Sequence, residues 1–308
     1  MKKLLYTVMC CCALASCTNL DSERYDAINP DFFPTNEKDA EALVVGGVYA
    51  PFRSAEYSGV FSTAHSFQVI GDMSTDIAVC CWVNDSWIPL TTHNWTPNHS
   101  YTTLNYTDYA KYLGTMTLTL DRISNVEMSD EKKALLVAET HLGRGWLAFL
   151  YDFYGPIPIP TLEDLKNPLD EVIEPRATQE EMTNFIETEL TESLKGLPTR
   201  TTQFGRFDKG LAYTILMKYY MHEKNWAKAE ECGRELLKAE YGYGLMDRYA
   251  DIFTLENEGN KEIIFACTEE RGTNLQLWHD HALPGNYPTQ NTAIQKWDGY
   301  KVPWPFYR

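Results

Sequence analysis

The sequence predicts a mainly α-helical protein, in which tetratricopeptide-like helical hairpins form a superhelix with long irregular loops inserted between them. Apolar residues recur at helical spacing in several stretches of the 308-residue chain. The clearest stretch is a hairpin over residues 209–243, where one apolar stripe ends at Tyr220 and a second begins at Trp226. Ala229 follows Trp226 by one helical turn, a large–small pair that lets neighbouring helices approach closely. Because one hairpin cannot bury both of its faces, we expect further helices beside it. The alternative is a lone helix pair inside another α-rich fold.

Residues 1–16 have the composition of a secretory signal peptide. Lys2 and Lys3 precede an apolar run that is shorter than the ~20 residues needed to span a bilayer. The run ends in Leu-Ala-Ser-Cys17, which resembles the lipobox of bacterial lipoproteins, so we expect Cys17 to become the lipid-bearing first residue of the mature chain. The alternative is ordinary cleavage after a small residue. Lipidation would anchor the protein durably, because each buried methylene contributes about 0.8 kcal/mol.

Residues 17–34 are polar and acidic and are expected to form a tether. The whole chain has 27 Lys and Arg residues against 43 Asp and Glu residues, a net charge of −16. Removal of the signal peptide removes two lysines, so the mature charge is 25 minus 43, or −18. A protein this acidic is not expected to bind nucleic acid or to adhere electrostatically to anionic lipid.

The helical domain is expected to occupy residues 35–260. Helical periodicity predicts three helices in its first half, over residues 35–52, 104–128 and 130–154. Asn36 is suited to cap the first of them.

The helix over residues 130–154 contains Gly143 and Gly145, each of which costs about 1 kcal/mol relative to Ala inside a helix. Such glycines are tolerable where another backbone packs against them. After this helix, Thr178 and Glu181 have the spacing of a capping box, which predicts a helix from Thr178 to Leu194.

Two regions lack helical periodicity. Residues 71–101 form a long polar and aromatic segment, and residues 271–308 form a second segment rich in Trp and Tyr. Long irregular loops in compact domains are often functional. Residues 261–266, which precede the second segment, are expected to form a strand or an extended link.

No metal or cofactor is expected from the sequence. The four cysteines after Cys17 include no C-x-x-C pair, so a zinc site is not indicated, although one disulfide is possible. His279-Asp280-His281 could place two imidazoles on one face of a strand, but no third ligand is evident. A solvated polar loop is the favoured alternative.

Four stretches, taken in order, resemble the SusD/RagB family of surface lipoproteins. They run from Ala138 to Pro158, from Pro175 to Pro198, from Gly205 to Ala229 and from Tyr249 to Phe265. Together with the lipobox, the likeness covers nearly all of residues 17–308.

The resemblance implies an α-rich superhelix that is lipid-anchored in the outer membrane and faces the exterior. It implies a SusC-like TonB-dependent transporter as partner, to which the protein would deliver a ligand that is usually a glycan. The ligand site of the family is non-catalytic and aromatic and needs no cofactor.

Two groups of residues correspond to the family's ligand loops. One group is Trp82, Asn84, Asp85 and Trp87, and the other is Trp278, Tyr287 and Trp297. Flat aromatic faces can stack on sugar rings while neighbouring Asn and Asp side chains bond to hydroxyls. The alternative is that these aromatic side chains pin long loops by packing. Trp95, which leads into the next helix, is assigned to the core.

Members of this family are usually longer, and residues 261–308 are expected to be the start of a truncated C-terminal region. Three functional alternatives remain open. A peptide or another nutrient could replace the glycan within the same family. A secreted α-helical glycoside hydrolase would need two acids across a sugar, such as Glu269-Glu270 or Asp72 and Asp76. A scaffold of helical repeats would bind no small ligand.

Overall fold

A computed structural model describes residues 33–53, 59–167, 169, 174–269, 277–292 and 294–307. The predicted signal peptide, Cys17 and nearly all of the predicted tether lie outside these residues. The described α-helices are α2 (Glu37–Val44), α3 (Phe67–Met73), α4 (Ile88–Thr91), α5 (Ser100–Ser124), α6 (Asp130–Tyr151), α7 (Leu162–Lys166), α8 (Gln179–Ser193), α9 (Lys209–His222), α10 (Trp226–Leu236), α11 (Trp278–Ala282) and α12 (Trp304–Tyr307). A π-helix, η2 (Val45–Tyr49), and the 3-10 helices η3 (Ala50–Phe52), η4 (Asp152–Tyr154), η5 (Ala239–Tyr241), η6 (Tyr249–Phe253) and η7 (Leu255–Asn257) complete the helical segments.

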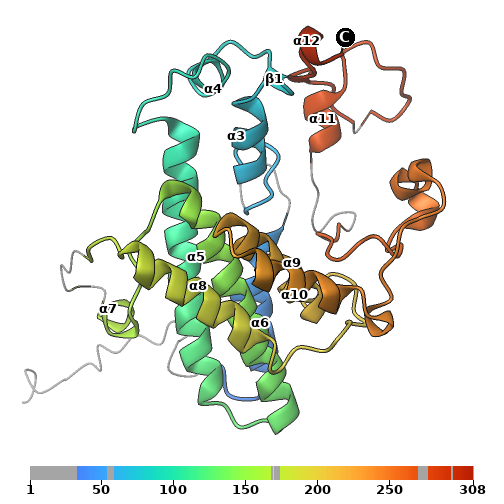
Figure 1. Ribbon diagram of the computed structural model, residues 1–308. Helices are drawn as coiled ribbons and strands as arrows, with labels where there is room; N and C mark the ends of the chain where they lie inside the picture. Colours follow the sequence, from blue (N-terminus) through green and yellow to red (C-terminus); the bar gives the residue numbers. More distant parts are fainter. Residues whose placement is uncertain are drawn as a thin grey trace, which may run out of the picture.

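The long helices α5, α6, α8, α9 and α10 pack side by side and form the body of the molecule (Figure 1). α6 lies between α5 and α8, and α9 packs on α10. One continuous apolar core runs through these helices and α2. The predicted mainly α-helical class is confirmed. In the part of the chain that the structure describes, no helix combines the length and the apolar character needed to cross a membrane.

The predicted starts of two helices follow from capping side chains, whereas α5 spans Ser100–Ser124 and not the predicted residues 104–128. Asn36 accepts a hydrogen bond from the backbone N–H of Asp39, and α2 continues without a break into η2 and η3, as expected for residues 35–52. The capping box is present: Thr178 accepts from the N–H of Glu181, whose carboxylate accepts from the N–H of Thr178. Satisfying these N–H groups fixes where a helix begins.

Gly143 and Gly145, the two glycines inside α6, both lie at close helix contacts. A Cβ on Gly145 would lie 2.8 Å from the side chain of Leu190 and 3.0 Å from its backbone nitrogen, so α8 crosses α6 at this point. A Cβ on Gly143 would lie 2.6 Å from the side chain of Val48 in η2. The expectation that another backbone packs at such a glycine is therefore confirmed for Gly145.

The hairpin over residues 209–243 forms as α9 and α10, but the second apolar stripe is only partly buried. Ala229 and Cys232 are buried against α9, whereas Trp226 is 62% exposed and Leu237 is 86% exposed. The small member of the large–small pair therefore packs within the hairpin, and the large member faces away from the described residues of the core.

The segment over residues 71–101 is more regular than the sequence predicts. It contains the end of α3, a short strand β1 (Val79–Cys80), α4 and the start of α5. β1 pairs antiparallel with β2 (Tyr300–Lys301), with Val79 opposite Lys301. The sequence could not show this strand, because its partner lies more than 200 residues away. Residues 261–266 contain a turn at residues 261–262 and a bend at residue 264, and they form no strand.

His279, Asp280 and His281 lie on α11, so both the strand and the solvated-loop interpretations are wrong. Asp280 is 8% exposed and His281 is 2% exposed. The Asp280 carboxylate accepts from the N–H of Gln295, and the carbonyl of His281 accepts from the N–H of Gly299. These contacts give the two buried residues a structural role in holding residues 295–299.

The four described cysteines, Cys80, Cys81, Cys232 and Cys267, are free thiols. Burial raises the pKa of Cys80 to about 11 and that of Cys267 to about 12. Both thiols are therefore protonated at neutral pH, which fits buried packing and not reactive chemistry.

Candidate functional site

Four of the predicted aromatic ligand residues converge from two distant segments. Trp82 and Trp87 lie between β1 and α4, whereas Trp278 is the first residue of α11 and Trp297 lies between α11 and β2. These elements are at the end of the molecule drawn at the top of Figure 1. Tyr300 joins them: its ring centroid lies 6.0 Å from that of Trp82, 5.5 Å from that of Trp87 and 6.1 Å from that of Trp278. We call these five residues the aromatic cluster.

The aromatic cluster is mainly a packing unit. Trp87 is only 2% exposed, so its ring faces are covered by protein. The indole N–H of Trp82 donates to the carbonyl of Trp297 at 3.1 Å, and its ring covers Gly299, where a Cβ would overlap it. The packing alternative therefore describes Trp82 and Trp87 in this structure: they hold residues 297–301 against β1.

The other predicted ligand residues lie at the surface. Asn84 is exposed, but its side-chain oxygen accepts from the N–H groups of Ser86 and Trp87 and so closes the turn before α4. Asp85 in the same turn is exposed. Tyr287 is 43% exposed and lies outside the aromatic cluster. The structure therefore does not unite Asn84, Asp85 and Tyr287 with the tryptophans in one open face.

An open pocket of about 590 Å³ lies beside the start of α5. Trp95 and Phe153 present exposed aromatic surface there, with exposed fractions of 47% and 60%. The assignment of Trp95 to the core is therefore wrong. The pocket is lined by Trp95, Thr96, Pro97, Thr102, Thr103, Tyr106, Phe153, Tyr154 and Arg176.

Hydrogen bonds and ring contacts hold the wall of the pocket in place. The hydroxyl of Tyr154 donates to the carbonyl of Thr102 at 3.5 Å, and Arg176 Nη1 donates to the carbonyl of Pro156 at 2.8 Å. The guanidinium carbon of Arg176 lies 5.8 Å from the ring centroid of Tyr106. Burial raises the pKa of Tyr154 to about 12, so its hydroxyl stays protonated at neutral pH.

The arrangement suits recognition of a ligand that has both apolar faces and hydroxyls. Concave sites of this size that combine aromatic walls with a few fixed polar groups are typical of ligand-binding pockets. Trp95 and Phe153 supply aromatic faces, Thr102 and Thr103 supply hydroxyls, and Arg176 supplies a cation. Among the described residues that line the pocket, none carries a carboxylate.

Sequence analysis does not identify three residues of this pocket as ligand-site residues, and the reasons are local. Phe153 continues the apolar stripe of the predicted helix, but α6 ends at Tyr151 and the tighter turn of η4 takes Phe153 off the buried face. Trp95 lies in the loop between α4 and α5, and the following Pro97 was a signal that the helix had not yet begun. Arg176 carries no pattern that marks it.

A family model described as starch-binding and associating with the outer membrane matches residues 23–221, which is more than half of the chain. Among solved structures, the chain is similar to a laminarin-binding SusD-like protein, with 21% identity and a TM-score of 0.69 over 87% of this chain and 62% of that chain. It is also similar to a SusD superfamily protein from Bacteroides vulgatus, with 18% identity and a TM-score of 0.69 over 88% and 62% of the two chains. Among curated proteins, none matches this sequence.

A SusD-like protein from Bacteroides fragilis has 21% identity and a TM-score of 0.66 over 82% of this chain and 48% of that chain. This chain therefore spans between 48% and 62% of the length of the three structures described. The structural likeness confirms the SusD-like helical fold, and the family match extends from the tether region through α9. The chain belongs to the SusD-like family, described as starch-binding and associating with the outer membrane.

Proposed function

We propose that this protein is a cell-surface lipoprotein that binds poly- or oligosaccharide and delivers it to a SusC-like TonB-dependent transporter of the outer membrane. The observation that carries the proposal is an open aromatic pocket in a member of a family described as starch-binding. A protein of the same fold is described as laminarin-binding, which supports a glycan as the ligand class.

The pocket beside α5 is the proposed binding site. The exposed rings of Trp95 and Phe153 would stack on the apolar faces of sugar rings. Arg176 and the threonine hydroxyls would bond to sugar hydroxyls. Because Tyr154 and Arg176 are already fixed by hydrogen bonds, the wall that they form loses little freedom on binding.

The loop residues predicted from the sequence form a second, discontinuous surface in the proposal. Asn84, Asp85 and Tyr287 are exposed and can reach hydroxyls of a long glycan. Trp278 and Trp297 are partly exposed, whereas Trp82 and Trp87 support the loops by packing. This surface would extend the contact and would not replace the pocket.

Binding without hydrolysis is the favoured chemistry. Glycoside hydrolysis generally uses two carboxyl groups placed across the scissile bond. None of the described residues lining the pocket is an Asp or a Glu. A secreted hydrolase is therefore the weaker alternative, and we assign no catalytic residue.

The proposed membrane attachment uses residues outside the described part of the chain. Residues 1–16 would be removed as a lipoprotein signal peptide, Cys17 would carry the lipid, and residues 17–34 would tether the helical domain. Residues 35–260 would form that domain, and residues 261–308 would begin a C-terminal region. The family's description as associating with the outer membrane supports this arrangement.

A peptide or another nutrient is the alternative ligand within the same family. The test is isothermal titration of the purified chain against plant, host and microbial polysaccharides, with a peptide mixture as the second arm and chromatography of every mixture for released products. The proposal expects heat from at least one polysaccharide class, no product, and no heat from the peptides. Binding of peptides alone, or release of shortened sugars, would contradict it.

The same titration separates the two surfaces. Asn84→Ala and Tyr287→Ala would each weaken binding of a long polysaccharide but would leave binding of a short oligosaccharide unchanged. If these variants abolished binding of the short oligosaccharide, the predicted loops and not the pocket would be the primary site.

A further inference from the structure

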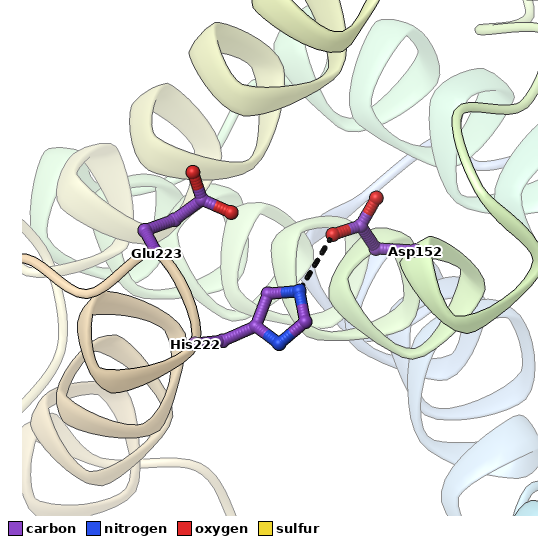
Figure 2. A group of neighbouring side chains, drawn as sticks. All are labelled: Asp152, His222 and Glu223. Atoms are coloured by element: carbon purple, nitrogen blue, oxygen red, sulfur yellow. Dashed lines mark ion pairs between the residues drawn. The ribbon is translucent and has the colours of Figure 1, made fainter.

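Three side chains with metal-ligating atoms meet where α6 and α9 end. Asp152 is the first residue of η4, while His222 is the last residue of α9 and Glu223 follows it (Figure 2). Each offers one ligand atom, and these atoms all lie within 4.8 Å of one another. His222 Nε2 lies 3.3 Å from Asp152 Oδ2.

The side chain of Asp152 is almost inaccessible to solvent and has one basic partner. Its side chain is only 6% exposed, whereas that of His222 is 56% exposed. Among the residues that the structure describes, His222 is the only basic side chain within ion-pair distance of Asp152. Removing a carboxylate from water is costly unless a cation or several hydrogen bonds compensate it. The site therefore favours an additional cation.

The surrounding helices favour a cation in the same place. Asp152 caps the C-terminus of α6, and Glu223 caps the C-terminus of α9. The C-terminal end of a helix carries a partial negative charge, so two such ends add to the charge of the carboxylates. Phe149, one turn before Asp152, also contacts the ring of His222, with centroids 5.9 Å apart, and restricts its orientation.

The geometry points to a site for a divalent transition-metal ion of the zinc class, held by Asp152, His222 and Glu223, with its remaining position open to water. In a tetrahedral zinc site with bonds of about 2.0–2.2 Å, ligand atoms lie roughly 3.3–3.6 Å apart. The His222–Asp152 pair already has this spacing, and the exposed Glu223 side chain can close the third edge. Calcium requires about 6–8 oxygen ligands and magnesium disfavours a nitrogen ligand, so neither fits this set.

Such an ion would link the ends of α6 and α9 across 70 positions of sequence, which explains why no sequence motif indicates it. It would also fix Asp152 in η4, the turn that contributes Phe153 and Tyr154 to the pocket wall. The inference concerns metal binding alone and does not depend on the ligand of the pocket.

The test is titration of chelator-treated protein, prepared without an oligohistidine tag, with Zn²⁺ by calorimetry and with Co²⁺ by visible absorption. We expect one equivalent of each ion to bind and Co²⁺ to give the spectrum of a four-coordinate site. Asp152→Asn and His222→Ala should each weaken Zn²⁺ binding at least about tenfold. The matched controls, His279→Ala and Glu231→Gln, change exposed residues elsewhere and should bind as the parent does.

Glu223→Gln keeps the test informative if either of the other variants misfolds. Glu223 is exposed, so its replacement should leave the circular dichroism spectrum unchanged. It should also weaken Zn²⁺ binding. Zn²⁺ binding no tighter than about 1 mM in the parent protein would overturn the inference. Binding that survives in folded Glu223→Gln and His222→Ala proteins would overturn it equally, because the ion would then lie elsewhere.

Discussion

At the residue scale, Glu139 and Arg206 form an enclosed ion pair that connects α6 to the loop before α9. Arg206 Nε donates to Glu139 Oε1 at 2.9 Å, and Nη2 donates to Oε2 at 2.8 Å. Glu139 is 1% exposed, and burial raises its pKa although Arg206 opposes this. Both residues belong to stretches that resemble the family in sequence. The resemblance here has a structural cause, because one bidentate ion pair fixes a helix to a distant loop.

Arg206→Ala should lower the free energy of unfolding by about 3–5 kcal/mol, because it leaves the Glu139 carboxyl buried without its partner. Urea unfolding followed by circular dichroism measures this change. Lys195→Ala is the control. It removes an exposed pair with Glu192 and should cost no more than about 1 kcal/mol. Equal losses in the two variants would contradict the assignment of Arg206 as the partner of a buried charge.

His65 gives the protein a pH dependence of known sign. It is 3% exposed, and burial lowers its pKa below the ordinary value of 6.5, although Asp108 opposes the shift. The unfolded chain then binds a proton more readily than the folded protein. The stability that neutral His65 provides is complete above pH 6.5 and is lost as the pH falls below that value.

The prediction is a difference between the parent protein and His65→Gln. Between pH 7.5 and pH 5, which are chosen to bracket the ordinary histidine pKa of about 6.5, the parent should lose more unfolding free energy than the variant. Urea unfolding at both values measures it. The same loss in both proteins would show that His65 does not titrate in this range.

At the element scale, the crossing of α6 and α8 depends on Gly145. Gly145→Ala should destabilise the protein by about 1–3 kcal/mol, because a Cβ would press on both the side chain and the backbone of Leu190. Gly71→Ala in α3 is a matched control, since nothing lies within 4 Å of the added carbon there. That substitution should stabilise the protein by up to about 1 kcal/mol through helix propensity. Thermal unfolding distinguishes them, and a rise in Tm for Gly145→Ala would refute the close crossing.

Helices such as α2 and α8 could be predicted from sequence because their signals are local. Apolar spacing and capping residues such as Asn36 and Thr178 act within a few positions, and the structure places α2 and α8 where these residues predict. The pairing of β1 with β2 could not be predicted, because two short strands far apart in sequence have no local signal. The same holds for α11, where the burial of Asp280 and His281 depends on contacts with residues 295–299.

The candidate site could be predicted only in part. The sequence predicts aromatic ligand loops, and four of their tryptophans meet, but Trp87 is buried and the indole of Trp82 is held by a hydrogen bond to Trp297. Exposure is a tertiary property that residue type does not reveal. For the same reason the sequence predicts a core position for Trp95, which is 47% exposed in the structure.

At the scale of the whole molecule, the helical body positions a pocket that no single element could form. The loop after α4, the start of α5, η4 and Arg176 meet at one place because α5 and α6 pack side by side. The aromatic cluster occupies a separate core and holds the C-terminal segment. The central claim is therefore that the exposed side chains of Trp95 and Phe153 contact the ligand.

The most direct measurement is the affinity of the purified chain for a glycan that it binds, compared between two pairs of variants. Trp95→Ala is paired with Trp226→Ala, and Phe153→Ala with Phe253→Ala, because the second member of each pair is at least as exposed but lies outside the pocket. We expect Trp95→Ala and Phe153→Ala to weaken binding by about tenfold or more, the usual effect of removing an aromatic contact residue, and the paired controls to bind as the parent does. Unchanged affinity in both pocket variants, or equal losses in the controls, would contradict the account.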